Sequence, residues 1–263
     1  MAALSLNGWT VPLLLEGAQQ TPDVGEDAAP SVSGEMIRLR RYVKQKWSIK
    51  AGPLTAAQKA DLFGLALGQC DHWSFDESGT DWQWSEGGIG LLSGTATYTT
   101  ATPSPKYGAG YIDVGTSNLP TFDARIAGAW TLLAWRYESG AWHHHAITST
   151  GDYYEDGAVT GSAPVGLAVT SGSVRLGSTL STQQWDDLVL LRWAASAELV
   201  AAVYAAGAAF RGPDQWATGD LLEADSGGLL VTFDPPTSEY RPFTSAGTTE
   251  LYGQNATLSM REV

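Results

Sequence analysis

The strongest constraint on the fold is a series of short segments between residues 94 and 194, each separated from the next by a turn signal. The segments are rich in β-branched and aromatic residues, and glycines such as Gly140, Gly151 and Gly172 lie between them. Each has the length of one strand, and evenly spaced strands of this kind are typical of a β-sandwich. The clearest segments are GTATYTT, AGYIDVG, AWTLLAWRYE, WHHHAITST, GDYYEDGAV, VGLAVTS, SVRLGST and DDLVLLRWA.

The stretches on either side of this series have a different pattern. LSLNGWTVPLLL predicts two strands joined by a turn at Asn7-Gly8, and EMIRLRRYVKQKWSIKAG predicts one long strand. Between them, QQTPDVGEDAAPSVSG predicts a turn-rich acidic loop. Near the end of the sequence we expect two or three strands broken at Pro235-Pro236 and Arg241-Pro242, followed by a strand in ATLSMREV.

Two helices are expected among these strands. One covers residues 54–67, where Thr55 is a capping residue and Gly68 ends the apolar pattern. The other is SAELVAAVYAAG, in which Ser196 precedes an apolar face.

These patterns predict a mainly β protein with two parts. Residues 1–70 and residues 212–263 each hold too few strands to close a barrel alone, but together they hold enough. We therefore expect a small split β-barrel-like domain made of both stretches, with one helix near 54–67, into which a sandwich at 71–211 is inserted. Charged residues make up only 16% of the chain, and this also favours strands joined by many turns.

Charge excludes some partners. The formal net charge of −13 at pH 7 would repel a phosphate backbone and an anionic membrane surface, so we expect no nucleic acid partner and no membrane insertion. The first residues lack the pattern of a signal peptide, and the single cysteine, Cys70, excludes an internal disulfide. Positive charges gather on the predicted long strand, where they are candidates for subunit contacts or form a solvated strand face: Arg38, Arg40, Arg41, Lys44 and Lys46.

Three consecutive histidines raise the question of a metal site. Strand alternation would place His143 and His145 on one face and His144 on the other, so the three cannot converge on one ion. We interpret the run as a central strand of the sandwich, with imidazoles packed among the neighbouring tryptophans Trp130, Trp135 and Trp142.

The middle of the chain resembles the laminin-G-like, or concanavalin A-like, jelly-roll superfamily. The resemblance covers roughly residues 71–211 and rests on DHWSFDESGTDW, YGAGYIDVG, WTLLAWRYESGAWHHHAITST, YYEDGAV and WDDLVLLRWAASAELVAAVYAAG. It implies a structural calcium ion near the first and last strands, held by Asp76 together with Asp186 or Asp187. The alternative is that the acidic pair ends a turn and faces solvent. No other cofactor is expected.

The flanking parts resemble phage distal-tail and related minor tail proteins. The resemblance rests on LSLNGWTVP, RRYVKQKWSI, PLTAAQKADLF, CDHWSFD and ATLSMREV. It implies a homo-oligomeric ring, usually hexameric, that contacts other phage tail proteins. It also implies a protein made in the host cytoplasm and carried in the virion at the tail tip or baseplate.

Sugar recognition needs an aromatic plate and polar acceptors. Candidates in predicted loops or turns are Trp82, Trp84, Tyr107, Tyr153 and Tyr154, with Asp152 and Asp156 as acceptors. Each aromatic residue has core or edge packing as its alternative role.

Enzymatic activity is not expected. Glu155 and Asp156 are adjacent and cannot form the alternate-position carboxylate pair of sandwich glycosidases, and no Gly-x-Ser-x-Gly nucleophile turn occurs. Our functional hypothesis is a structural tail-tip component whose sandwich contacts a host glycan or a neighbouring protein. The main alternative is a stand-alone carbohydrate-binding lectin, and a glycan hydrolase is a third class.

Overall fold

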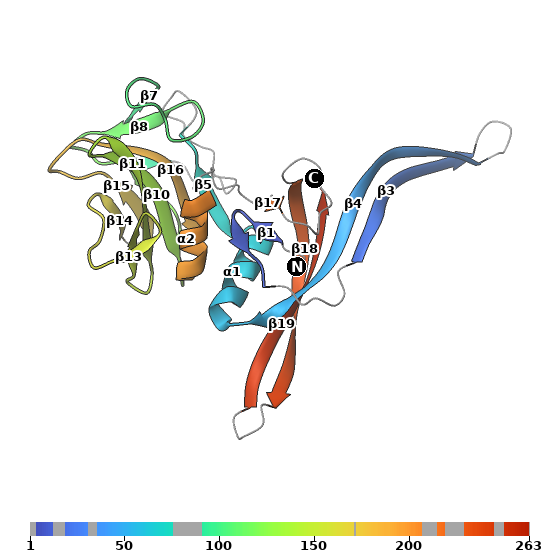
Figure 1. Ribbon diagram of the computed structural model, residues 1–263. Coiled ribbons are helices and arrows are strands. Elements are labelled where there is room, and N and C mark those ends of the chain that lie inside the picture. The colour runs from blue at the N-terminus through green and yellow to red at the C-terminus, as the bar shows by residue number, and fades with distance from the viewer. Residues whose placement is uncertain are drawn as a thin grey trace. The chain divides into compact units, whose positions relative to one another are not determined.

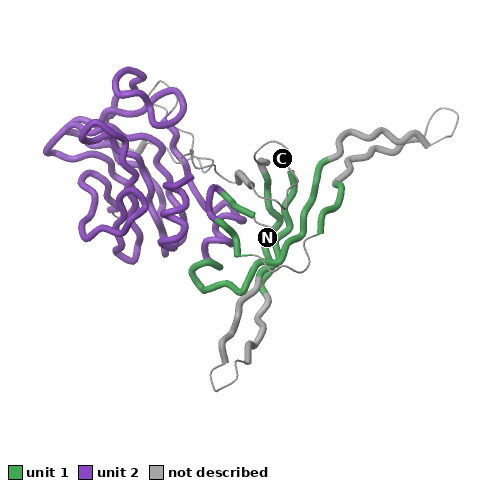
Figure 2. The backbone as a smooth tube through the Cα atoms, viewed as in Figure 1, with its two compact units in different colours: residues 1–6, 10–59, 214–263 green, residues 7–9, 60–213 purple. Residues whose placement is uncertain are grey.

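The computed structural model describes residues 4–12, 19–30, 36–75, 91–170, 172–206, 215–218, 229–244 and 250–262 (Figure 1). Side chains are described throughout these ranges except at 23–30, 36–43, 91–93, 215–218, 229–230, 239–244 and 250–255. The chain is mainly β, as expected. It divides into two compact units, one of residues 1–6, 10–59 and 214–263 and one of residues 7–9 and 60–213 (Figure 2).

The second unit contains the sandwich. Its larger sheet has eight strands in the order β13-β12-β11-β10-β16-β8-β7, with β5 also paired to β16. The bounds are β5 Cys70–Trp73, β7 Thr97–Thr99, β8 Tyr111–Val114, β10 Thr131–Glu138, β11 Ala141–Thr148, β12 Tyr153–Glu155, β13 Ala158–Thr160 and β16 Gln183–Leu191. The histidine run therefore lies on β11, inside the sheet, as predicted.

A smaller sheet forms the other layer. It has four strands in the order β14-β15-β9-β6, with bounds β6 Leu91–Ser93, β9 Thr121–Phe122, β14 Leu167–Thr170 and β15 Ser173–Leu176. Trp185 and Leu188 of β16 share one apolar core with Phe122 of β9 and Val174 of β15. All four side chains are fully buried, so the two sheets pack face to face and the predicted β-sandwich is confirmed.

A tight turn sets the register at the centre of the large sheet. Ser139 and Gly140 have φ of 53° and 91°, which a two-residue hairpin turn requires, and the turn pairs Glu138 with Ala141. The register then places His145 opposite Ala134 and His144 opposite Trp135. On the other side of β10, the pairing with β16 shifts by one residue between Leu133 and Trp135.

Both predicted helices are present. Helix α1 spans Ala56–Ala66 and begins with a reciprocal cap, in which Gln58 N donates to Thr55 Oγ1 (3.2 Å) and Thr55 N donates to Gln58 Oε1 (3.0 Å). Helix α2 spans Ala197–Ala206, and Leu199 N donates to Ser196 Oγ (3.1 Å). No described helix has the length and apolar character needed to cross a membrane.

The first unit is built on a seven-stranded sheet in the order β2-β1-β17-β18-β19-β4-β3. The bounds are β1 Ser5–Leu6, β2 Trp9–Thr10, β3 Gln19–Pro30, β4 Met36–Leu54, β17 Gln215–Thr218, β18 Leu229–Thr244 and β19 Glu250–Glu262. Strands from both flanks thus share one sheet, and the described pairings give an open order from β2 to β3. Barrel-like closure and the expected domain boundaries stay predictions.

Two sequence expectations in this unit are wrong. Residues 19–30 form strand β3 instead of a loop, because they pair along their whole length with the long strand β4. β18 also continues through Pro235-Pro236 and Arg241-Pro242 instead of breaking there. A register shift between Asp234 and Thr237 accommodates the first proline pair, since a bulge removes the need for a ladder hydrogen bond.

Candidate functional site

Polar side chains continue the inner face of the large sheet beyond the apolar core. His145 lies opposite the core residue Ala134 in register, so its ring is on the core face. Arg136 lies two positions along β10 on the same face, with its guanidinium 5.8 Å from the ring centroid of Trp185. Glu155 of β12 is opposite His145. The three neighbouring strands therefore bring a guanidinium, an imidazole and a carboxylate together.

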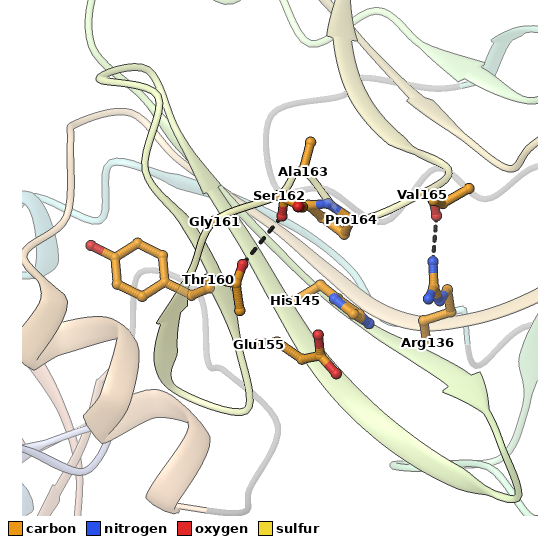
Figure 3. A pocket seen from close by; sticks show the side chains of 10 residues that line it. Arg136, His145, Glu155, Thr160, Gly161, Ser162, Ala163, Pro164 and Val165 are labelled. Carbon is orange, nitrogen blue, oxygen red and sulfur yellow. Dashed lines mark hydrogen bonds between the residues drawn. The ribbon is translucent and has the colours of Figure 1, made fainter.

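These side chains line a pocket of about 350 Å³ (Figure 3). Its other wall is the loop that follows β13, and Figure 3 shows this loop facing His145, Glu155 and Arg136. The lining residues are Arg136, His145, Tyr154, Glu155, Thr160, Gly161, Ser162, Ala163, Pro164 and Val165. The pocket therefore combines charged groups from the sheet with small and apolar side chains from the loop.

Arg136 attaches the loop to the sheet. Its Nη1 donates to the carbonyl of Val165, and its Nη2 pairs with Glu138. The same carbonyl accepts a hydrogen bond from Gln183 Nε2 at 3.2 Å. The side chain of Val165 is exposed, so the loop presents apolar surface at the pocket while its backbone is fixed.

His145 is a neutral group of the site at pH 7. Burial, together with the nearby charges of Arg136 and His143, lowers the pKa of His145 to about 4. Its Nε2 lies 2.9 Å from Glu138 Oε1, which suits donation from a neutral imidazole to the carboxylate. Burial also lowers the pKa of Arg136, against the opposing effect of Glu155, and the group remains charged.

His143 belongs to a second contact at the edge of this site. Its Nδ1 lies 2.8 Å from Asp156 Oδ2, while Asp156 Oδ1 accepts from the backbone N–H of His144 at 2.9 Å. Burial alone would raise the pKa of Asp156, but these hydrogen bonds from His144 and His143 hold it below its ordinary value. Glu155 lies nearby. One oxygen of its carboxylate, the Nδ1 atom of His143 and one carboxylate oxygen of Asp156 all lie within 4.8 Å of one another.

His144 is on the opposite face, so the predicted division of the histidine run is confirmed. Its ring centroid is 5.1 Å from Trp135 and 6.1 Å from Tyr204 of α2. Burial, with a smaller electrostatic effect of the neighbouring His145 ring, lowers the pKa of His144 to about 4. The predicted packing of an imidazole against a tryptophan is therefore present at Trp135.

The residues expected to bind a glycan are not gathered into one aromatic surface. Trp82 and Trp84 lie outside the described residues. Tyr107 packs edge-on against Trp135, with its hydroxyl buried, and Tyr153 packs against the sandwich core.

Of the other glycan candidates, only Tyr154 lines the pocket, and at 5% exposure it offers no open face for stacking. Asp152 is exposed and is hydrogen-bonded to Thr150 Oγ1 at 2.7 Å. Asp156 is engaged by His143 and His144, as described above. The aromatic plate expected from the sequence is therefore not formed by the described candidates.

Asp186 and Asp187, two of the expected calcium ligands, already have nitrogen partners within their own unit. Asp186 Oδ2 accepts from the backbone N–H groups of Lys106 (2.8 Å) and Tyr107 (3.0 Å), and Asp187 pairs with His72. Burial raises the pKa of Asp186 to about 7, so its carboxyl favours the neutral form. Calcium needs several oxygen ligands, whereas these contacts are N–H donors. Asp76 lies outside the described residues, and the calcium site stays a prediction.

The basic residues expected at subunit contacts lie on β4. The side chains of Arg38, Arg40 and Arg41 are outside the description. Lys44 is half-buried, and Lys46 Nζ lies 3.1 Å from Asp234 Oδ2 on β18. Of the basic residues whose side chains are described, Lys46 therefore has an ion-pair partner within its own unit.

Arg136, His145 and Glu155 were not predicted from the sequence as members of one site. A sequence signal for part of this arrangement was present in the hairpin turn at Ser139-Gly140. A two-residue turn fixes which residues of β10 and β11 lie opposite each other. The loop at 160–165 had no such signal, since its position depends on hydrogen bonds to Arg136 and Gln183 that are distant in sequence.

No protein-family model matches the chain, and no curated protein matches it. The chain is similar in structure to a botulinum neurotoxin type G receptor-binding domain, with a TM-score of 0.36 and 11% sequence identity. The match covers 67% of this chain and 63% of the toxin domain, so it spans less than two thirds of that domain. At this TM-score the likeness carries no argument about fold or function, and the sandwich rests on the topology above. The resemblance to phage tail proteins stays a prediction.

Proposed function

We propose that the sandwich unit is a binding module that recognises a polyhydroxylated ligand, a glycan, in the pocket between β10–β12 and the loop at 160–165. The observation that carries this proposal is the pairing of fixed polar groups with apolar walls in a pocket of about 350 Å³. That volume is within the usual range for small-molecule sites. A sugar unit offers hydroxyl groups on its edges and C–H groups on its faces, and the pocket holds complements to both.

Each part of the lining has a role in this proposal. The exposed carboxylate of Glu155 accepts hydrogen bonds from two ligand hydroxyls, and N–H groups of Arg136 donate to a ring or hydroxyl oxygen. Pro164 and Val165 provide the apolar surface for a C–H face. Arg136 and Gln183 position that wall through the Val165 carbonyl.

The test is titration of the full chain with a panel of neutral mono- and disaccharides, followed by NMR and calorimetry. We expect weak binding, with Glu155→Gln reducing affinity at least fivefold. Asp123→Asn is the matched control, since it removes an exposed carboxylate of the same unit that contacts only Arg125 in the described structure. Equal affinity in Glu155→Gln and the parent, or no binding of any sugar, would reject the pocket as a glycan site.

We further propose that the chain works as a structural component of an assembly, of the phage tail-tip kind, in which the first unit contacts copies of itself. Two β-hairpins support this proposal. Residues 36–45 of β4 pair only with β3 among the described strands, and residues 250–253 of β19 pair only with β18. Each hairpin thus extends beyond its sheet as two strands.

Two-stranded hairpins have little stability of their own, and their outer edges carry unpaired N–H and C=O groups. Neighbouring copies in a ring would cover those edges by strand pairing. Basic residues on β4 and the net charge of −13 would contribute to contacts with other proteins. The role proposed for the whole chain is binding and assembly without turnover.

Light scattering and electron microscopy of the purified chain test the assembly. We expect a closed ring, with six copies as the symmetry implied by the distal-tail resemblance. A monomer at all concentrations, together with sugar binding, would favour the stand-alone lectin instead. Release of shorter products from a glycan would contradict the non-enzymatic role.

A further inference from the structure

We infer that His143, Glu155 and Asp156 form a binding site for a divalent transition metal ion, with Zn²⁺ as the best-fitting cation. The inference concerns the edge of the large sheet, where β11 meets the turn between β12 and β13. The inference does not rest on the proposed glycan binding. The two proposed sites share Glu155, and their other residues differ.

The three residues offer a convergent set of ligand atoms. His143 Nδ1, one oxygen of Glu155 and one oxygen of Asp156 all lie within 4.8 Å of one another. Ligands on a tetrahedral Zn²⁺ ion lie about 2 Å from the metal, and therefore roughly 3.4 Å from each other. The His143–Asp156 separation of 2.8 Å is already inside that distance. His143 Nδ1 and Asp156 Oδ2 must therefore move apart by about half an ångström to bind the same ion, and the exposed Glu155 side chain must adjust as well.

The Asp156 carboxylate is held in the orientation that a ligand needs. The His144 N–H donates to Oδ1, and the backbone N–H of Asp156 donates to the His144 carbonyl at 2.8 Å. Oδ2 is consequently directed at His143. Hydrogen bonds of this kind, made by the oxygen that does not bind metal, fix ligands in known metal sites.

The donor set selects the type of metal. One imidazole nitrogen and two carboxylates suit Zn²⁺, Co²⁺ or Ni²⁺, whereas calcium prefers six to eight oxygen ligands. The side chains of His143 and Asp156 are 27% and 34% exposed, so an ion can enter and water can complete its coordination. On binding, the metal replaces the hydrogen bond between His143 Nδ1 and Asp156 Oδ2, and the ring then carries its N–H on Nε2.

The proposed site draws on ligands that the pattern of the histidine run does not reveal. Strand alternation separates His144 from His143, as expected, but the further ligands come from a turn on the neighbouring strand. Asp156 has φ of 50° and Gly157 has φ of 77°, so a tight turn carries the carboxylate back toward β11.

The test is calorimetric titration of the chelator-treated full chain with ZnCl₂, without sugar. We expect one Zn²⁺ per chain, with affinity at least tenfold weaker in His143→Gln and in Asp156→Asn. Asparagine can still accept the His144 N–H and is tolerated at positive φ, so the turn is expected to persist. His72→Gln and Asp123→Asn are matched controls, each removing a similar group elsewhere in the same unit, and they should bind as the parent does.

A second measurement keeps the inference testable if a variant unfolds. In the parent protein, ¹⁵N NMR should show a large shift of His143 Nδ1 on addition of Zn²⁺, with little change at His72. Unchanged zinc affinity in His143→Gln, loss of binding in His72→Gln, or an unshifted His143 Nδ1 would each overturn the site. Failure of sugar binding would leave these outcomes unaffected.

Discussion

Trp135 and His144 face each other across the β10–β11 pair, with ring centroids 5.1 Å apart and planes inclined by 54°. Tyr204 of α2 lies on the same imidazole, so the histidine is enclosed by aromatic rings. Its Nδ1 is buried without a hydrogen-bond partner among the described residues. The ring therefore contributes packing to the sheet more than it contributes polar contacts.

We predict that His144→Phe keeps or increases stability. Phenylalanine retains the contacts with Trp135 and Tyr204 and removes a buried polar atom, whose desolvation costs about 1 kcal/mol or more. Because the pKa of His144 is lowered to about 4, the substitution removes no charge at pH 7. Urea unfolding at pH 7 measures the effect. His144→Ala is the control, which should lose about 3 kcal/mol through the cavity.

Asp186 gives a prediction about pH. Its pKa is raised from 3.8 to about 7, so between these values the folded state holds a proton that the unfolded state has lost. Stability from this group therefore falls as pH rises from about 4 to about 7. Asp186→Asn removes the dependence and should be more stable than the parent at pH 8 by about 4 kcal/mol, at about 1.4 kcal/mol per pKa unit.

The measurement is denaturant unfolding of parent and Asp186→Asn at pH 4.5 and pH 8. The difference between the two proteins should be small at the lower pH, where Asp186 is protonated in the folded state. An equal difference at both pH values would mean that the folded state does not retain the proton.

Two glycines of the pocket loop should respond differently to alanine. Gly166 has φ of 89°, and an added Cβ would lie 1.9 Å from Gln183 Oε1. That contact would displace Gln183 and its hydrogen bond to the Val165 carbonyl, so Gly166→Ala should cost about 2 kcal/mol or more. A Cβ on Gly161 meets nothing within 4 Å, and Gly161→Ala should change stability by less than about 1 kcal/mol. Thermal unfolding of both variants decides whether the loop wall is fixed as described.

Asp61 of α1 is hydrogen-bonded to the segment that leads into α2. Its Oδ1 accepts from Trp193 Nε1 at 2.9 Å and from Ser196 N at 3.1 Å, and the side chain is fully buried. Asp61→Ala leaves both donors without an acceptor and should cost about 2–4 kcal/mol in the free energy of unfolding. Asp61→Asn keeps an acceptor oxygen and should cost less. Comparable losses in both variants would indicate that the negative charge, and not the acceptor, holds this contact.

Local signals in the sequence predicted the elements that depend on neighbouring residues. The caps at Thr55 and Ser196 follow from short spacing rules. The division of the histidine run also followed, because strand alternation is a property of the strand itself.

Distant pairing explains what the sequence did not predict. Residues 19–30 look like a loop because of their prolines, glycine and acidic residues, and only the adjacent β4 makes them a strand. The register shift opposite Trp135 is carried by Asp187, whose φ of 50° has no local sequence signal. The pocket was not predicted for the same reason, because Arg136 and the carbonyl of Val165 come together only after the sheets have packed.

The position of β19 between β18 and β4 affects the order in which the chain can fold during synthesis. Residues 60–213 contain all the strands of both sandwich sheets, so that unit can complete its core while the ribosome is still translating. β4 emerges early, yet its second neighbour is made only when residues 250–262 appear. Until then β3 and β4 form a lone hairpin with a free edge, which nascent chains on the same messenger could pair with. Co-translational assembly would turn this delay into an advantage, because copies would meet before their own sheets close.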